Sequence, residues 1–245
     1  MTDQSKRVFL DLEVGDRDEA ARQDAAYQRA KEFLATVRHQ YGWPDTLDEL
    51  GDEEKEIFVE AYASDPSWSA RGAPRLRGSE SIRGRLEIVL YSNAAPKTVE
   101  NFRCLCTGER GKGKASGKAL HYRGTRMHRV VKDFVVQGGD VVKGDGSGGD
   151  SIYTGGAFKD EKGGLALKHD GVGVVAMANS GPHTNRSQFY ITLAPQLPQC
   201  DGKHVVFGRV LNASGLDLLR YINDHVASES GDPLMDVYIT ECGEL

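Results

Sequence analysis

The alternation of apolar and polar residues changes character twice along the chain and so defines three regions. Residues 7–14 (RVFLDLEV) alternate apolar and polar positions, which is typical of a strand buried on one face. Residues 16–80 follow a helical period, and from residue 81 onward short β-type runs alternate with glycine-rich turns. This order predicts a mainly β protein with an α-helical insertion between its first and second strands.

Two helices are predicted within residues 16–80. The first, at roughly 18–41, carries apolar residues at i, i+4, i+7, i+8, i+11 and i+15 and should end at Gly42. Asp52 is expected to cap the second helix, and Pro66 is expected to stop it. A short helical turn is predicted around Leu47.

The insertion is also the acidic part of the chain. Residues 16–80 contain 15 Asp and Glu against 9 Lys and Arg, a net charge of −6, so that the remainder carries about +1 of the total of −5. Residues 69–80 (SARGAPRLRGSE) have the composition of a linker.

The region after residue 81 holds two amphipathic helix candidates, near 99–106 and 215–225. Its strand candidates include 81–91, the run MHRVVKDFVVQGGD at 127–140 taken as one strand, and four later runs. About eight short strands with two helices predict an eight-stranded, closed antiparallel barrel capped by two helices.

Composition narrows the classes of function. The net charge of −5 and the pI near 5.8 argue against general binding of nucleic acid. No apolar run approaches the roughly 20 residues of a membrane span, and the N-terminus has no signal-peptide core, so a cytoplasmic protein is expected. Four cysteines are too few for a disulfide-stapled scaffold and are expected to be reduced thiols.

Three motifs lack the sequence context that their usual functions require. Gly144–Gly149 (GDGSGG) contains GxGxxG, but turn and strand residues follow where a dinucleotide site needs a helix. The histidines lack metal-ligand spacing, and Ser187 lacks the GxSxG elbow of a hydrolase. Neither a metal nor another cofactor is therefore expected.

One charged side chain stands out within the β region. Arg129 and Gln137 lie among valines in the run 127–140, which otherwise has the composition of a buried strand. A buried charge costs several kcal/mol unless it is paired, so the arginine needs a physical explanation.

That run belongs to a series of motifs that together resemble the cyclophilin family of peptidyl-prolyl isomerases. The series includes APKTVENF (95–102), CTGERG (106–111), LKHDGVGVVAMAN (167–179) and DGKHVVFG (201–208), all in the order of the family. The resemblance covers 81–245 and takes 7–14 as the family's first strand. It implies a discontinuous isomerase domain, 7–15 plus 81–245, interrupted by the helical insertion 16–80.

The resemblance also implies an activity and a site. The expected activity is cis–trans isomerisation of X-Pro bonds in proline-containing peptides and proteins, with roles in protein folding and no cofactor. Arg129 matches the catalytic arginine, and Gln137 matches the glutamine that orients it. The remaining positions match the proline pocket or the adjoining groove: Phe134, Val135, Gly146, Ala178, Asn179, Ser180, Gln188, Tyr190, Gln199, Cys200 and His204.

The sequence departs from the family inside this pocket. Val135, Tyr190 and Cys200 stand where methionine, phenylalanine and leucine are common, and Gln199 falls at about the position of the cyclosporin-binding tryptophan. Weak cyclosporin binding is therefore expected. A binding or scaffold module with little turnover remains the main alternative, although retention of Arg129 and Gln137 favours an enzyme.

Two further features lie outside the common core. The loop 111–121 resembles that of the divergent-loop cyclophilins, in which two cysteines matching Cys106 and Cys242 are proposed as a redox pair, so a thiol redox sensor is a second alternative. The insertion is an appendage, a lid, or a docking surface for an unknown protein partner. For docking, Trp43, Trp68 and Tyr62 are candidate anchors.

Overall fold

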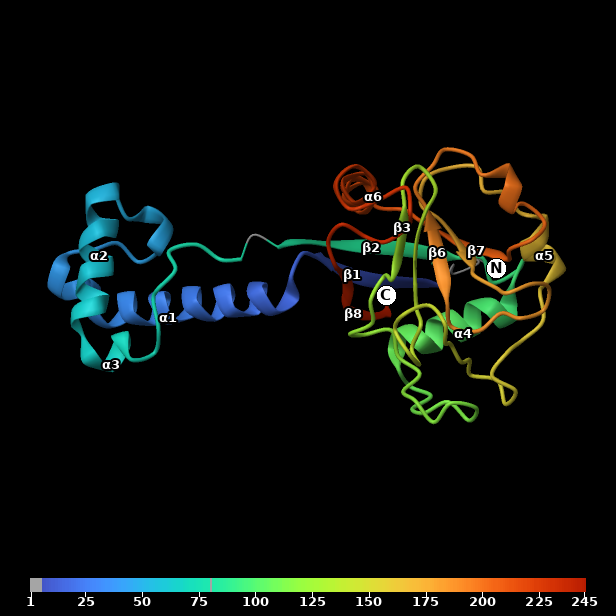
Figure 1. Cartoon of the computed structure of the whole chain (residues 1–245), viewed down its shortest axis with the longest axis horizontal. Coiled ribbons are helices and arrows are strands. Elements are labelled where there is room, and N and C mark those ends of the chain that lie inside the picture. Colours follow the sequence, from blue (N-terminus) through green and yellow to red (C-terminus); the bar gives the residue numbers. More distant parts are fainter. Residues whose placement is uncertain (1–5, 80) are drawn as a thin grey trace. The chain divides into compact units, whose positions relative to one another are not determined.

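A computed structural model describes residues 6–79 and 81–245 and divides the chain into two compact units (Figure 1). The barrel unit combines the residues up to Gly15 with Ile82–Leu245, and the helical unit is Asp16–Ser81. Each unit has its own apolar core. Both chain connections between the units run through the ends of two neighbouring strands, β1 (Arg7–Val14) and β2 (Ile82–Leu90).

The barrel unit is built on one eight-stranded sheet in the order β3-β4-β6-β5-β7-β2-β1-β8. Its strand pairs are antiparallel, which confirms the predicted fold class. The strands are β1 (Arg7–Val14), β2 (Ile82–Leu90), β3 (Arg129–Val131), β4 (Val135–Gly138), β5 (Val174–Met177), β6 (Phe189–Thr192), β7 (Val206–Val210) and β8 (Val237–Glu244).

The two end strands of the sheet, β3 and β8, do not form a regular ladder with each other within the described residues. The segment just before β3 bridges them instead. Met127 N donates to Val237 O at 2.8 Å, and Ile239 N donates to Thr125 O at 2.9 Å. The barrel therefore closes through a short bridge, and the eight-strand ladder itself stays open at this point.

The run 127–140 is a hairpin, so its interpretation as one strand was wrong. β3 and β4 pair with each other around a tight turn in which Asp133 takes a positive φ of 51°. Phe134 N donates to Val131 O across this turn at 3.2 Å. Because the chain reverses here, Arg129 comes to lie opposite Gln137.

Two helices pack against the sheet of the barrel unit. α4 (Pro96–Thr107) contacts β1, β7 and β8, and α6 (Ala213–His225) contacts β2 (Figure 1). Pro96 suits the first turn of α4, and Gly108 ends it in the left-handed conformation. The N-terminus of α4 is capped from a distance, because Glu161 accepts hydrogen bonds from the Lys97 and Thr98 amides at 3.0 and 2.8 Å.

The helical unit contains one long helix and three short elements: α1 (Arg17–Tyr41), η1 (Leu47–Glu49), α2 (Asp52–Ser64) and α3 (Pro66–Ser69). Asp16 caps α1 by accepting from Glu19 N at 2.9 Å, and Gly42 ends the helix with a φ of 70°. The N-cap of α2 is Gly51 and not Asp52 as predicted, and Pro66 begins α3 in addition to following α2.

The core of the helical unit is aromatic. Phe33 lies edge-on to Phe58, Tyr62 and Trp68, with ring centroids 5.0 to 5.6 Å apart. Trp43 and Tyr62 are buried, and Trp68 is half-buried against this cluster. These three side chains hold the unit together, so they are not the exposed docking anchors that the sequence suggested.

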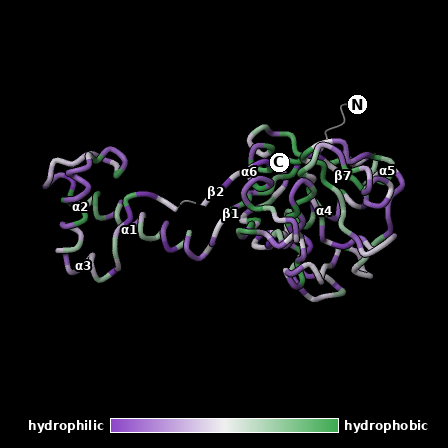
Figure 2. The backbone as a smooth tube through the Cα atoms, turned by 45° about the horizontal axis from the view of Figure 1, so that its top comes forward, coloured by the Kyte–Doolittle hydropathy of each residue, from purple (hydrophilic) through white to green (hydrophobic). Residues whose placement is uncertain are grey.

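The stretch 69–80 is less free than its composition indicated. Arg75 N donates to Ala26 O at 3.4 Å, and Ser79 N donates to the Asp24 carboxylate at 2.8 Å. The described part of this stretch therefore returns along α1. Figure 2 shows hydrophilic residues over much of the helical unit, in keeping with its acidic composition.

Two short helical segments complete the barrel unit, α5 (Lys162–Ala166) and η2 (Pro198–Cys200). Across the described residues, none of the helices combines the length and the apolar character that crossing a membrane requires.

Candidate active site

A row of cross-strand neighbours crosses the sheet and carries the two residues that the sequence singled out. Arg129 pairs with Gln137, Gln137 with Tyr190, Tyr190 with Ala176, and Ala176 with Val206. Residues directly opposite one another point to the same face of a sheet. The residues beside them along the strands belong to the barrel core: Val130, Val136, Ile191 and Val175. The row therefore lies on the outer face of the barrel.

Arg129 is consequently not a core residue, so its charge does not carry the desolvation cost of a fully buried ion. Its side chain is half-buried, with the guanidinium carbon 5.8 Å from the centre of the Phe134 ring. The aliphatic part lies against Gly231, where a Cβ atom would come within 3.3 Å of Arg129 Cγ. Among the described residues, no carboxylate forms an ion pair with it, so its donors remain available to a ligand.

Gln137 is held in place by a chain of amide hydrogen bonds. Its Nε2 donates to Gln188 Oε1 at 3.0 Å, and Gln188 Nε2 donates to the carbonyls of Gly146 and Gly148 at 2.8 and 2.7 Å. Both side chains are thereby fixed by the backbone of the glycine-rich loop. Six predicted site residues line one cavity of about 270 Å³ here: Gln137, Gly146, Ala178, Asn179, Ser180 and Gln188.

The glycine-rich loop is organised by Asp140, a residue that the sequence reading did not single out. Its buried carboxylate accepts four backbone N–H groups, from Val142, Lys143, Gly146 and Gly148, at 2.9 to 3.1 Å. Burial works to raise the pKa of Asp140, but these hydrogen bonds outweigh it and hold the pKa below its usual value. The signal was present in the sequence as an acid four residues before the glycine-rich run Gly144–Gly149.

Gly146 occupies a position that only glycine fits. Its φ is +89°, and an added Cβ would lie 2.6 Å from the ring of His128. His128 therefore supports the loop from beneath, and its burial lowers the pKa of its imidazole. The motif GxGxxG marks a tight loop beside the candidate site rather than a nucleotide-binding turn.

The predicted proline-pocket residues gather in one apolar cluster on the outer face. Val135, Tyr190 and Cys200 are buried in it, and Phe134 and Ala178 pack against its edge. Val135 and Gln137 are two residues apart on β4, so the apolar wall and the amide chain share a face.

The hydroxyl of Tyr190 is hydrogen-bonded to a histidine outside this apolar cluster. Its hydroxyl lies 2.8 Å from His169 Nε2, and His169 Nδ1 lies 3.0 Å from Asp201 Oδ1. The hydrogen bonds from the His169 side chain and backbone hold the pKa of Asp201 at about 2, so its carboxylate only accepts. Nδ1 then donates to Asp201, and in this tautomer Nε2 accepts from the tyrosine hydroxyl. Burial raises the pKa of Tyr190, which keeps this donor protonated.

The side chains of His204 and Asn179 are each held by a hydrogen bond to a backbone carbonyl. His204 Nδ1 lies 2.9 Å from Met177 O and donates to it, and the ring meets Tyr190 edge-on with centroids 5.4 Å apart. Burial lowers the pKa of His204, which favours the neutral ring. Asn179 Nδ2 donates to Lys203 O at 2.9 Å, and Ser180 N donates to Thr184 Oγ1 at 2.9 Å.

Gln199 and Cys200 are neighbours in η2 but have opposite environments. Gln199 is exposed, whereas Cys200 is 5% exposed and lies against Tyr190. Burial raises the pKa of the Cys200 thiol, so it is present as an apolar, protonated group.

The candidate redox pair lies in the barrel core, away from the outer face. Cys106 and Cys242 are both free and both buried. Burial raises the pKa of Cys106 well above its usual value and that of Cys242 to about 12. Since the thiolate is the reactive form, this environment disfavours thiol chemistry at neutral pH.

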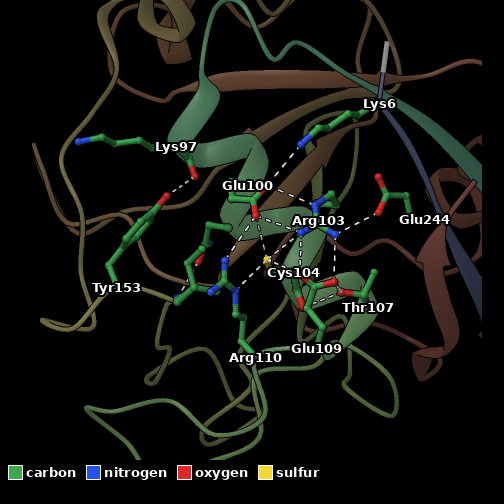
Figure 3. A network of polar contacts seen from close by, with 12 residues as sticks. Lys6, Lys97, Glu100, Arg103, Cys104, Thr107, Glu109, Arg110, Tyr153 and Glu244 are labelled. Atoms are coloured by element: carbon green, nitrogen blue, oxygen red, sulfur yellow. Dashed lines mark hydrogen bonds and ion pairs between the residues drawn. The ribbon is translucent and has the colours of Figure 1, made fainter. Parts of the chain in front are cut away.

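Another cysteine belongs to a charged network at the end of α4 (Figure 3). Glu100, Cys104 and Glu109 bring potential metal-ligand atoms within 4.8 Å of one another. The guanidinium of Arg103, however, contacts Glu100 at 3.0 Å and Glu109 at 2.6 Å, and it also reaches Glu244 at 3.0 Å. The carboxylates are thus engaged in ion pairs, and the network links α4 to the end of β8.

Comparisons with known proteins agree with this geometry. The family model described as cyclophilin type peptidyl-prolyl cis-trans isomerase/CLD matches residues 76–244. The NK-tumor recognition proteins of Mus musculus and Homo sapiens are each 49% identical to this chain over 162 residues, which is 66% of this chain and 11% of the relative. The chain thus spans about a tenth of the length of these curated relatives. It belongs to the family of cyclophilin-type peptidyl-prolyl cis-trans isomerases.

Proposed function

We propose that the barrel unit catalyses cis–trans isomerisation of X-Pro bonds in peptides and proteins, at the site on its outer face. The bond to be rotated has partial double-bond character and a barrier of roughly 18–20 kcal/mol. Lowering this barrier needs no covalent intermediate and no cofactor. It needs a pocket that holds the proline ring and a donor that interacts best with the twisted amide.

Arg129 is proposed as that donor. A guanidinium is always charged and presents several N–H groups, which suits a hydrogen bond to the proline nitrogen or the neighbouring carbonyl. Withdrawing the nitrogen lone pair from conjugation favours the transition state, in which the amide is twisted. Gln137 is proposed to orient the guanidinium, because it lies directly opposite on the neighbouring strand and is itself held by Gln188.

The roles of the remaining residues follow from their surroundings. Phe134, Val135, Tyr190 and Cys200 are proposed to hold the proline ring, with His204 at the edge. The groove for the preceding residues is proposed to run along Ala178, Asn179 and Ser180, beside Gly146 and Gln188. The observation that carries the proposal is that Arg129, which has no ion-pair partner among the described residues, lies beside a fixed amide chain and an apolar pocket.

The test is the isomerisation rate of a short Ala-Pro peptide with the wild-type protein and Arg129→Ala. Loss of the guanidinium should lower kcat/KM by about 100- to 1000-fold, the range found when a transition-state donor is removed. Arg85→Ala is the matched control and should leave the rate unchanged, since Arg85 pairs with Asp11 between β2 and β1, and three strands separate β2 from β4 in the sheet order. A folded wild-type protein without acceleration would overturn the proposal.

Weak sensitivity to cyclosporin is part of the same proposal. It rests on Gln199, which is exposed where the family's drug-binding tryptophan would stand. An amide cannot supply the packing area of an indole.

A binding or scaffold module with little turnover is the second candidate. The observations that favour it are the departures from the family at four pocket positions, Val135, Tyr190, Gln199 and Cys200. In that case the peptide should bind with ordinary affinity while the isomerisation rate stays at the uncatalysed value. A redox-sensing role for Cys106 and Cys242 is less favoured, because both thiols are buried with raised pKa values.

Location and partners complete the proposal. Four free, buried cysteines fit a reducing compartment such as the cytoplasm. A protein partner at residues 16–80 fits a unit that has its own core and lies almost wholly outside the region matched by the family model.

A further inference from the structure

The helical unit carries an open groove between its two main helices. The groove has a volume of about 590 Å³ and is lined on the α1 side by Phe33, Val37 and Tyr41. On the α2 side it is lined by Ile57 and Ala61. This α1/α2 groove belongs entirely to the helical unit and is separate from the candidate active site.

Its apolar walls are exposed in a way that the core of the unit does not require. Tyr41 is 43% exposed and Ile57 is 47% exposed, although both are large apolar side chains. The unit already has a compact core built from Phe33, Phe58 and Tyr62. Tyr41 is also held in place, because its ring stacks on Trp43 at 4.3 Å with an interplanar angle of 11°. The groove thus presents apolar groups that are partly ordered before any ligand binds.

The rim of the groove is acidic. Glu60 and Asp65 line it directly. Glu53 lies on the same face of α2 as Ile57, because residues four apart are neighbours on a helix. Among the described residues, Glu53, Glu56 and Glu60 have no basic partner within ion-pair distance, whereas Asp52 is paired with Lys55 at 3.3 Å. The helical unit as a whole has 15 acidic and 9 basic residues, a net charge of −6.

We propose that the α1/α2 groove binds a cationic amphipathic helix from a partner protein. Apolar side chains of such a helix, spaced at i, i+3 or i+4 and i+7, would contact Tyr41, Ile57 and Ala61. Its lysines and arginines would face Glu53 and Glu60. A second copy of this chain would bring like charges together, and anionic lipid or nucleic acid would be repelled by the same carboxylates. Charge complementarity therefore selects a basic protein segment.

The proposal extends to the barrel unit if the proposed isomerase function holds. The helical unit is inserted between β1 and β2, so a protein bound in the groove stays tethered to the chain that carries the proline pocket. Tethering raises the effective concentration of a second binding event. The unit would then favour X-Pro substrates that also carry a basic amphipathic helix.

The test is binding of a fluorescein-labelled 18-residue Lys/Leu peptide, patterned as an amphipathic helix, to the chain of residues 1–245. A Glu/Leu peptide of the same length tests the contribution of charge, and a Lys/Ser peptide tests the contribution of apolar contact. We expect the Lys/Leu peptide alone to bind, with affinity that falls as salt rises. Ile57→Ser should weaken binding about tenfold, and Glu53→Lys combined with Glu60→Lys should weaken it further.

Val59→Ser is the matched control. Val59 lies on the same helix, is 41% exposed and does not line the groove, so this variant should bind like the wild type. Equal affinity for Ile57→Ser and Val59→Ser, or equal binding of the Lys/Leu and Glu/Leu peptides, would overturn the proposal. A dimer of the wild-type protein in analytical ultracentrifugation that becomes a monomer in Ile57→Ser would also overturn it, because the groove would then be an interface between two copies of this chain. Binding is read without turnover, so failure of the isomerase assay leaves this test intact.

Discussion

In the barrel unit, hydrogen bonds fix the residues of the candidate site from behind, whereas the helical unit leaves its groove residues exposed. Gln137 is held through Gln188, and Tyr190 through His169. Tyr41 and Ile57 have nearly half of their surfaces in solvent. Lowering a chemical barrier requires groups that are already in position. Docking a partner requires apolar surface that becomes buried only on binding.

The two units also differ in their relation to the family. The family model matches residues 76–244, which excludes almost the whole helical unit. The match also excludes β1, although β1 pairs with both β2 and β8 in the sheet. The sheet of the matched region is therefore completed by β1, which precedes the insertion in the sequence. The helical unit is inserted without interrupting this sheet.

The largest effect is expected from Phe58→Ala, which tests whether the units are stabilised separately. Phe58 is fully buried in the aromatic core of the helical unit, and truncation of such a residue costs about 3–5 kcal/mol. In a thermal scan with a probe in each unit, the transition of the helical unit should shift down and that of the barrel unit should stay. Val59→Ala, at an exposed position on the same helix, is the control. A joint shift of both transitions would show that the two units unfold as one.

The next effect concerns the loop behind the candidate site. Asp140→Asn replaces one carboxylate oxygen by a donor that faces backbone N–H groups, so the free energy of unfolding should fall by about 2–3 kcal/mol. Asp145→Asn, on the exposed tip of the same loop, should have little effect. Chemical denaturation measures both. If the two variants behaved alike, Asp140 would not organise the loop.

This contribution should depend on pH in a defined direction. The folded-state pKa of Asp140 is lowered, so its stabilisation is fully present above the unfolded value of about 3.9 and is lost as pH falls through the folded value. The difference between wild type and Asp140→Asn should therefore persist from pH 7 to pH 5 and shrink below pH 4.

A smaller effect is expected from Tyr190→Phe. The change removes the hydroxyl that donates to His169 Nε2 and leaves a buried nitrogen unpaired, at a cost of about 1–2 kcal/mol. The ring that lines the pocket is kept, so kcat/KM should change by less than about threefold. Tyr153→Phe, which loses an exposed hydrogen bond to Lys97 O, should cost less stability. A large loss of activity in Tyr190→Phe would show that the hydroxyl acts on the substrate.

The smallest effect is expected from Gln199→Trp. Restoring an indole at this exposed position should raise the affinity for cyclosporin about tenfold, which corresponds to ~1.4 kcal/mol. Gln196→Trp, in the same loop and also exposed, should not change it. Calorimetric titration measures the affinity of each variant for cyclosporin. If Gln199→Trp leaves the affinity unchanged, Val135 or Tyr190 would be the cause of weak binding.

Local patterns predicted much of the fold but failed where distant residues decide the outcome. The period of α1 and its end at Gly42 follow from neighbours in the sequence, and both were predicted. α4 starts three residues earlier than predicted, at Pro96, because its cap is Glu161, far along the chain. The β3–β4 hairpin was missed because its turn has no glycine, and Asp133 takes the positive φ instead.

The candidate site shows the same limit. Motif positions named six residues that line the cavity of about 270 Å³, but not the groups that support the candidate site, Asp140 and His169. Their partners are backbone amides and a tyrosine on another strand, which no local spacing reveals. The prediction of docking anchors was wrong for a related reason. The sequence does not show whether an aromatic residue such as Trp43 is buried or exposed.

The most direct test of the account is exchange NMR of an Ala-Pro peptide in the presence of the protein, which reports binding and isomerisation in one experiment. With Arg129→Ala, we predict that the peptide still binds, with a dissociation constant within about threefold of the wild type, while exchange between its cis and trans forms slows at least about 100-fold. Equal exchange rates in wild type and Arg129→Ala would contradict the central claim, because catalysis would then not depend on the guanidinium on the outer face of the barrel.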